Sequence, residues 1–327
     1  MPGFGRDALD ITLHDIRCSI DLHDSSGDID DLDALNRSYA SNGYLFFRDI
    51  LPQTAVAEAR ERMFAPLIDR GLVRMAGEQG EWIGGDQSSL GQEAEEFRGV
   101  IQGLFEAEGV KPILRKLLGE EPSLVPIVQY RAFRPFGPTG AVHQDGFYSP
   151  GIEGFRPLWI PLVEMEEDMG GLALAVGVAE RGYLHNTDKM PMAPIPSDQI
   201  PEGVWARTHY RPGDILVIHP QTPHVGLANR SKYVRLSIDT RIQSAANPSV
   251  IAGRVLACAP DSVTLALEDG TEKRFEVTED SFLRTGAFAG QRLTRQEFVE
   301  VTPHGLDVVA SVAANDEIMM LRRLSGG

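Results

Sequence analysis

The stretch His143-Gln144-Asp145 places a histidine and a carboxylate two residues apart, inside a run that is typical of a strand. Side chains alternate across a β-strand, so His143 and Asp145 are expected to point to the same face. Together with a histidine from elsewhere in the chain, such a pair forms a 2-His-1-carboxylate triad, which suits Fe(II) and leaves coordination positions open. The pair therefore predicts a metal centre, provided that a further histidine lies beside it.

The composition is that of an ordinary globular protein. The 327 residues are 42% hydrophobic, which is enough to bury a core as one large domain, with or without a small appendage. The formal net charge of −16 argues against nucleic acid as a partner, because phosphate backbones are bound by clustered Lys and Arg. Cys18 and Cys258 are too few for a disulfide framework, so we expect a reducing compartment.

The sequence shows no recognisable targeting or membrane-spanning segment. Its first residues lack a basic region followed by an apolar one. No apolar run approaches the roughly 18–20 residues that cross a bilayer. We therefore predict a cytoplasmic protein that does not bind a membrane and acts on a small molecule, and we leave a homodimer open.

Periodicity and turn residues divide the chain into three parts. Residues 1–30 are polar and acidic and indicate a loosely ordered arm, 31–247 form the main domain, and 248–327 form a small β-rich module. The strands after residue 122 are separated by Gly and Pro clusters, as in a barrel or sandwich. Helices are predicted at 31–42, 52–70 and about 96–118, and strands at 44–47, 124–134, 140–146, 157–166, 171–176, 206–210, 214–219 and 233–243.

Two further segments have a distinctive pattern. Residues 180–204 form a long connection with four prolines, and long connections in compact domains are usually lids or binding loops. In the C-terminal module, residues 262–277 alternate like a hairpin, and Asp269-Gly270 at its tip predicts a type I′ turn. Residues 294–312 are also predicted to be strand.

The third metal ligand is not decided by the residues alone. His219 and His224 both lie in the stretch from Gly213 to His224, so one would be a ligand and the other a bystander. Beyond them, Arg235 and Ser237 share one face of an alternating run. If that face points inward, the Arg235 fork would bind a carboxylate through two parallel hydrogen bonds; otherwise Arg235 is a solvent-facing residue on a half-exposed strand.

Several motifs together resemble the phytanoyl-CoA dioxygenase family. They are HQDGFYSP from 143, PLWIPLVEMEEDMGGLALAVG from 157, and GDILVIHPQTPHVGLANRSKYVRLSI from 213, and the resemblance covers roughly residues 30–245. It implies a mainly β fold with flanking helices, built on a double-stranded β-helix (jelly-roll, cupin-like) core. It also implies an oxygenase that uses Fe(II), 2-oxoglutarate and O₂.

The resemblance assigns a role to each candidate site residue. His143 and Asp145 match the family's first two iron ligands, and His224 matches the distal ligand because it directly precedes the Gly226–Ser231 segment. Arg235 and Ser237 match the pair that holds the distal carboxylate of 2-oxoglutarate. Gln129 and Trp159 fall where the family often contacts the co-substrate. His219 is then expected to be a packing or outer-sphere residue.

The same resemblance narrows the reaction. Related halogenases have a small residue where this chain has Asp145, so hydroxylation of an unactivated C–H bond is expected rather than halogenation. Desaturation, epimerisation and ring formation use the same site. The family's usual Pro-Gly-Ser-His is replaced by Val-Gly-Val-Ala at 176–179, which is expected to reshape the pocket entrance but not the iron site. Phe147, Tyr148, Tyr183, His185 and Trp205 are the candidates for lining the pocket.

Two other functions share part of this pattern. A cupin-type metal oxidoreductase or isomerase would need the triad but no 2-oxoglutarate, and it leaves Arg235 and Ser237 unexplained. A non-catalytic binding protein on a degenerate oxygenase fold is the other. The absence of a Lys- and Arg-rich patch favours a free small molecule, such as a secondary metabolite, over an acyl-CoA substrate.

Overall fold

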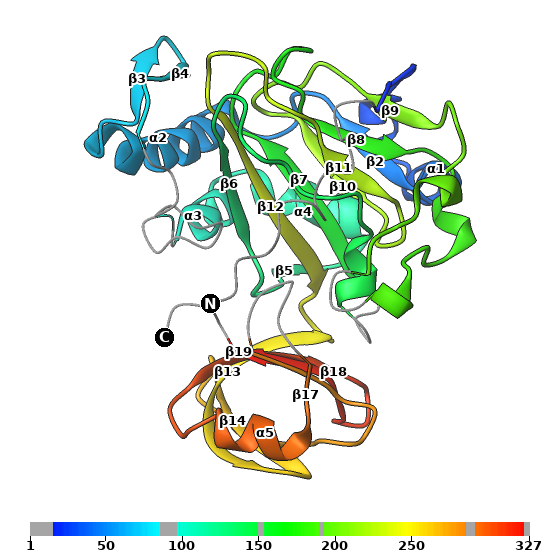
Figure 1. The fold of residues 1–327 in the computed structure, drawn as a ribbon, viewed down its shortest axis with the longest axis vertical. Helices are drawn as coiled ribbons and strands as arrows, with labels where there is room; N and C mark the ends of the chain where they lie inside the picture. The colour runs from blue at the N-terminus through cyan, green and yellow to red at the C-terminus, as the bar shows by residue number, and fades with distance from the viewer. Residues whose placement is uncertain are drawn as a thin grey trace.

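The computed structural model describes residues 16–85, 97, 99–149, 154–189, 193–285 and 292–323. Figure 1 shows a larger main domain above a smaller C-terminal unit. No helix within the described ranges is long and apolar enough to cross a membrane.

Two β-sheets form the centre of the main domain. The smaller sheet has the order β1 (Ile20–Asp21), β9 (Trp205–Arg207), β8 (Leu172–Ala175) and β11 (His224–Gly226). The larger has the order β2 (Tyr44–Phe47), β10 (Ile215–Ile218), β7 (Arg156–Pro161), β12 (Arg235–Ser244) and β5 (Pro122–Leu124), and β6 (Gln129–Phe133) also pairs with β12. Along the chain from β7 to β12, the strands β7, β10 and β12 belong to the larger sheet, and β8, β9 and β11 belong to the smaller one. This division of successive strands between two sheets confirms the mainly β jelly-roll fold.

Helices cover the outer face of the larger sheet (Figure 1). They are α1 (Leu32–Asn42), α2 (Gln53–Asp69), α3 (Val100–Glu106) and α4 (Val110–Leu118). Side chains of α3 and α4 pack against Leu158, Ile160 and Thr240, which point outward from β7 and β12. The prediction of one continuous helix at about 96–118 is wrong, because the structure has two helices there. Gly109 adopts the left-handed conformation, with φ of 88°, and separates α3 from α4.

The inner face of the larger sheet is polar around β12. Leu158 and Ile160 point outward, and paired residues point to the same face, so their partners Thr240 and Ile238 also point outward. Side chains alternate along a strand, so the residues between these positions point inward. Asp239 pairs with Trp159 of β7 and with Gln129 of β6, and Ser237 pairs with Arg131. The inward side chains of β12 are therefore Arg235, Ser237, Asp239 and Arg241. The prediction that Arg235 and Ser237 lie on one strand face opposite Leu236 agrees with this register.

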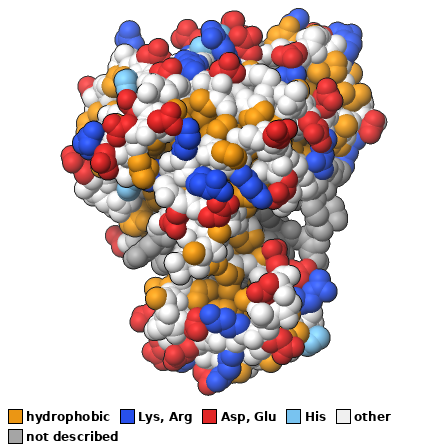
Figure 2. Space-filling model, turned by 180° about the vertical axis from the view of Figure 1, so that it is seen from behind, with side chains coloured by type: hydrophobic (Ala, Val, Ile, Leu, Met, Phe, Trp, Pro, Cys, Tyr) orange, Lys and Arg blue, Asp and Glu red, His pale blue; other side chains and the backbone are white. Residues whose placement is uncertain are grey.

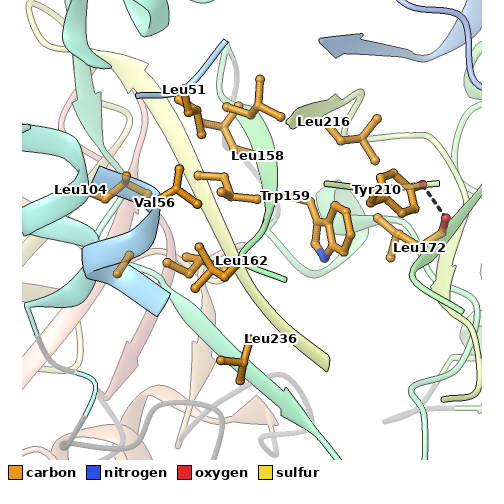
Figure 3. Packing of buried hydrophobic residues seen from close by; sticks show 14 of the residues in the cluster. Leu51, Val56, Leu104, Leu158, Trp159, Leu162, Leu172, Tyr210, Leu216 and Leu236 are labelled. Atoms are coloured by element: carbon orange, nitrogen blue, oxygen red, sulfur yellow. Dashed lines mark hydrogen bonds between the residues drawn. The ribbon is translucent and has the colours of Figure 1, made fainter. Parts of the chain in front are cut away.

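Aromatic residues fill an apolar part of the interior of the main domain. Trp159 and Tyr210 are buried with their ring centroids 4.7 Å apart, and Figure 3 shows them beside Leu172 and Leu216. Gly171 has φ of 84°, and a Cβ there would come within 2.8 Å of the Tyr210 ring. Glycine is thus needed where the chain enters β8, because the ring occupies the space of any side chain.

Tyr210 offers a direct test of this packing. It is fully buried, and its hydroxyl donates a 2.7 Å hydrogen bond to the Leu172 carbonyl. We expect Tyr210→Phe to lower the free energy of unfolding by about 1–3 kcal/mol, because that carbonyl is left without its partner. Urea unfolding measures the change. Tyr183→Phe, at a half-exposed position, is the control and should change the free energy by no more than about 0.5 kcal/mol. Equal effects would contradict the assignment.

The N-terminal segment is tied to the main domain from residue 20 onward. Ile20 and Asp21 pair with β9, and the backbone N–H of Ser25 donates to the Phe46 carbonyl. A 3-10 turn follows at Ser26–Asp28. Within the predicted arm, residues 20–28 are therefore bonded to the sheets; residues 1–15 lie outside the described part of the chain.

The C-terminal unit is a separate sheet with its own apolar core. Val255, Leu265, Phe275 and Leu321 are among the residues of that core. The sheet has the order β15 (Glu272–Glu276), β14 (Ser262–Leu267), β13 (Val250–Ala259), β18 (Asp307–Val312), β19 (Ile318–Arg323), β16 (Phe282–Arg284) and β17 (Arg292–Leu293), with the helix α5 (Arg295–Glu300) against it.

Two local predictions for this unit are wrong. The segment 294–312 is not one strand, since Thr294 and Glu297 form a capping box that starts α5. The hairpin tip is not a type I′ turn, because Gly270 has positive φ but Asp269 does not. Gly270 instead donates its N–H to the Leu267 carbonyl, and the Asp269 carboxylate accepts from Thr271.

The C-terminal unit contacts the main domain through apolar and polar groups. Val125 and Phe155 of the main domain pack with Val250 and Val309 of the unit. Figure 2 shows hydrophobic side chains at this narrow junction, while acidic and basic groups are mixed over the rest of that face. The buried Arg284 donates to the carbonyl of Tyr148, 3.1 Å away.

Candidate metal centre

Three side chains converge beside the inner face of the larger sheet. The Nε2 atoms of His143 and His224 lie 3.7 and 3.9 Å from Oδ1 of Asp145. One ligand atom from each of the three residues lies within 4.8 Å of the others. These gaps leave room for one metal ion with bonds of about 2 Å. Two imidazoles and one carboxylate form the facial donor set that suits Fe(II).

The backbone brings these residues together in a way that differs from the predicted strand at 140–146. Only His143 makes a ladder contact there: its N–H and C=O bond to the C=O and N–H of His224, at 3.1 and 2.9 Å. Gln144 is extended, and Asp145 begins the 3-10 turn η5 (Asp145–Tyr148). One extended residue is enough to place His143 and Asp145 on the same side, so the alternation argument holds although the long strand does not form.

Backbone carbonyls orient both imidazole rings. Nδ1 of His143 lies 2.9 Å from the Ala141 carbonyl, and Nδ1 of His224 lies 3.0 Å from the Thr222 carbonyl. Each Nδ1 must then carry the proton, which leaves the Nε2 lone pair directed at Asp145. Burial and the neighbouring His224 lower the pKa of His143 to about 3, so this ring is neutral and ready to bind a metal at physiological pH.

Arg241 fixes the carboxylate. Its guanidinium donates to Oδ2 of Asp145 at 2.9 Å, which turns Oδ1 toward the two histidines. Burial alone would raise the pKa of Asp145, but Arg241 and the two imidazoles outweigh it and lower that pKa to about 2. The carboxylate is therefore charged. Arg241 was not among the sequence candidates, although the alternation from Arg235 extends to it.

Arg235 is a buried cation on the same inner face. It is 2% exposed, and its Nη1 donates to the carbonyls of Gly171 and Leu227, while the Phe133 ring lies 4.5 Å below the guanidinium. Burial lowers its pKa to about 10, so it still carries its charge at neutral pH. Within the described ranges no carboxylate forms an ion pair with it, and a buried charge of this kind calls for an anionic partner.

The remaining candidates for co-substrate contact have different surroundings. Ser237 is buried on the inner face beside Arg131 and Pro161. The Gln129 side chain accepts from Arg131, which also pairs with Asp239. Trp159 packs against Tyr210 inside the apolar core. Thus Ser237 and Gln129 sit among polar groups, whereas the surroundings of Trp159 are those of a packing residue.

His219 lies apart from the three converging residues. Its ring centroid is 5.2 Å from that of Tyr39, and its Nδ1 accepts the backbone N–H of Gln221. Burial lowers its pKa, with a smaller effect from Arg156. Among the described residues, the cluster of possible metal-binding side chains contains His224 and not His219.

The aromatic candidates gather next to the turn that carries Asp145. Phe147 stacks on His185, with ring centroids 3.9 Å apart and an angle of 10° between the planes. Tyr148 and Tyr183 meet this pair edge-on. Trp205 lies elsewhere, on β9, where it pairs with Ala175. Four of the five predicted pocket residues thus form one aromatic cluster, joining the 143–149 segment to the 180–204 connection.

Buried neutral histidines predict acid sensitivity of the metal-free protein. The pKa values of His143, His185 and His219 are all lowered below the ordinary value near 6.5, chiefly by burial. The unfolded chain then binds protons first, so the free energy of unfolding should fall as pH drops below about 6.5, by up to about 1.4 kcal/mol per pH unit for each group. Urea unfolding with EDTA at pH 7.5, 6.5 and 5.5 measures it. A constant or rising value would contradict this prediction.

Comparison with known proteins decides the family. The phytanoyl-CoA dioxygenase (PhyH) family matches residues 39–237, which is more than half of the chain. The chain belongs to the phytanoyl-CoA dioxygenase family. The resemblance seen in the sequence motifs is therefore confirmed, and with it the assignment as an Fe(II)- and 2-oxoglutarate-dependent dioxygenase.

Two curated proteins with sequences similar to this chain are hydroxylases from Streptomyces species. The 1-deoxypentalenic acid 11-beta-hydroxylase of Streptomyces arenae is 27% identical over 249 residues, which covers 69% of this chain and 86% of the relative. The enzyme of the same name from Streptomyces exfoliatus is 26% identical, covering 67% of this chain and 83% of the relative.

Two solved structures are examples of partial similarity to this chain. The epimerase SnoN from nogalamycin biosynthesis, in complex with Fe³⁺, alpha-ketoglutarate and nogalamycin RO, has 19% identity and a TM-score of 0.48, over 65% of this chain and 84% of that one. EctD from S. alaskensis, with 2-oxoglutarate and 5-hydroxyectoine, has 17% identity and a TM-score of 0.48, over 64% of this chain and 75% of that one.

Proposed function

We propose that this dioxygenase hydroxylates an unactivated C–H bond of a small-molecule substrate at Fe(II) held by His143, Asp145 and His224. The convergence of these three donors carries the proposal. The buried Arg235 on the same inner face supports 2-oxoglutarate as the co-substrate, because within the described ranges no carboxylate lies at ion-pair distance from its guanidinium.

The bound metal and 2-oxoglutarate would supply the oxidising power: one O₂ oxidises the C–H bond to an alcohol while 2-oxoglutarate is converted to succinate and CO₂. The chain itself supplies position and charge. His143, His224 and the charged Asp145 would hold the metal, while Arg241 keeps Oδ1 of Asp145 turned toward the two histidines. We assign the distal carboxylate of 2-oxoglutarate to Arg235 and Ser237, with Gln129 as a further contact.

For the substrate we propose a secondary metabolite, and carboxylic acids are the first compounds to examine. The two Streptomyces relatives are 1-deoxypentalenic acid 11-beta-hydroxylases, and 1-deoxypentalenic acid is a carboxylic acid. The aromatic cluster around Phe147 and His185 offers an apolar wall for a hydrocarbon body. We further propose that the protein is cytoplasmic.

Succinate release tests the reaction. The protein is loaded anaerobically with Fe(II) and 2-oxoglutarate, which should give a weak visible charge-transfer band, and is then exposed to O₂ with each candidate acid. We expect succinate to form only when the metal and 2-oxoglutarate are both present, and to increase with a substrate that gains one oxygen atom by mass spectrometry. Product without any need for 2-oxoglutarate would support a cupin-type oxidoreductase or isomerase. Absence of both the band and succinate would support a non-catalytic binding protein.

A further inference from the structure

We infer that Gln144, the residue between two proposed metal ligands, is a positioning residue that fixes residues 182–185, at the start of the 180–204 connection, beside the candidate metal centre. This inference rests on the proposed function for its catalytic meaning. Gln144 is extended, so its side chain points away from those of His143 and Asp145. The side chain is 0% exposed and lies where three segments of the chain meet.

The amide group of Gln144 uses both of its ends. Its Nε2 donates to the carbonyls of Gly182 and Gln221, at 2.8 and 2.7 Å. Its Oε1 accepts the backbone N–H of Leu184 at 2.8 Å. The bonds to Gly182 and Leu184 join the segment that carries His143 and Asp145 to the start of the 180–204 connection. The bond to Gln221 joins the same segment to the loop that leads into His224.

His185 adds a fourth bond between the same segments. Its Nε2 accepts the backbone N–H of Gln144 at 3.2 Å, and its Nδ1 lies 2.6 Å from the Ala193 carbonyl. These partners require a neutral ring protonated on Nδ1. The ring stacks on Phe147, so the bond that holds the backbone of Gln144 also places the aromatic cluster.

These contacts bear on the prediction that residues 180–204 form a lid or binding loop. Residues 182–185, at its beginning, are bonded to the segment that carries His143 and Asp145. The next residue, Asn186, donates its backbone N–H to the Pro194 carbonyl at 3.0 Å. The wall made by Tyr183 and His185 is therefore held at a fixed place relative to the metal. A substrate that packs on this wall would have its C–H bond positioned by Gln144, through the loop and not by direct contact.

Hydrogen exchange of the metal-free protein tests the inference. Gln144→Leu removes all three side-chain bonds. Gln144→Glu keeps the shape and the acceptor for Leu184 but turns an oxygen toward two carbonyls. We expect both variants to exchange the amides of residues 182–186 at least about tenfold faster than the native protein, because buried bonds there are lost. Exchange in β12 should stay as in the native protein.

Two further measurements separate positioning from general damage. Gln243→Leu is the matched control, since Gln243 is another buried glutamine whose amide bonds both ways to the backbone of Val250. It should loosen the start of β13 and leave 182–186 unchanged. The charge-transfer band with Fe(II) and 2-oxoglutarate should be retained in both Gln144 variants.

The outcomes are distinguishable from those of the proposed function. Native exchange at 182–186 in both variants would overturn the inference, as would faster exchange spread uniformly over the protein. A Gln144→Glu variant that behaves like the native protein would also overturn it, because shape alone would then suffice. If the native protein releases no succinate, the proposed function fails, while the exchange result still decides whether Gln144 fixes the loop.

Discussion

His224→Ala is expected to abolish iron binding and turnover while leaving the protein folded. The substitution removes one of three donors, and even partners outside the coordination sphere change metal affinity by about 10–100-fold, so we expect a loss of at least about 100-fold. The fold should survive because the bonds between His224 and His143 are made by backbone atoms, which alanine keeps. Anaerobic Fe(II) titration followed by the charge-transfer band, with succinate release in air, measures both effects.

His219→Ala is the matched control for this prediction. His219 is a partly buried histidine five residues before His224, but its ring packs against Tyr39. Losing it should cost some stability through that contact and the bond from Gln221. Iron binding and succinate release should remain close to native. If His219→Ala instead removed iron binding and His224→Ala did not, the proposed set of ligands would be wrong.

The candidate metal centre could be predicted from the sequence because two of its three residues lie close together in the chain and are of metal-binding types. His143 and Asp145 need only one extended residue between them to face the same way, and this condition is met although the predicted strand is not formed. The choice between His219 and His224 was different. Alternation and spacing left both open, and only the family motif around Gly226 favoured His224 before the structure placed it beside Asp145.

The residues that support the ligands were missed because their partners are distant in sequence. Arg241 meets Asp145 across 96 positions, and Gln144 meets Leu184 across 40. Extending the alternation of β12 past Asp239 would have placed Arg241 on the inner face, so that signal was present in the sequence. No comparable pattern marks Gln144, whose role appears only when the loop at 182–185 is folded against it.

Local errors in the predicted fold also have physical causes. The helix predicted through 96–118 overlooked that Gly109 adopts positive φ, which divides it. The strand predicted through 294–312 overlooked the Thr294–Glu297 capping box, although its spacing is visible in the sequence. In both places a local signal, a glycine with positive φ or a capping box, outweighs the periodicity of the apolar side chains.

Arg235→Ala is expected to raise the 2-oxoglutarate concentration needed for turnover, with little change in iron binding. A hydrogen bond to a charged group contributes about 1.5–3 kcal/mol, which corresponds to a rise of roughly 10–150-fold in the apparent Kd of 2-oxoglutarate. Iron binding should persist because no contact joins Arg235 to the three ligands in the described chain; its Nη1 bonds to backbone carbonyls near β8 and β11. Titration of the charge-transfer band with 2-oxoglutarate, at saturating Fe(II), measures the shift.

The control for Arg235 is Arg254→Ala, since Arg254 is an exposed arginine on β13 that pairs with Asp307. It should titrate with 2-oxoglutarate like the native protein. Arg235→Lys keeps the charge but not the planar fork, so it should fall between the native protein and Arg235→Ala. If Arg235→Ala titrated like the native protein, the distal carboxylate would have to bind elsewhere on the inner face, and Arg131 would be the next residue to change, because it lies beside Ser237 on the paired strand.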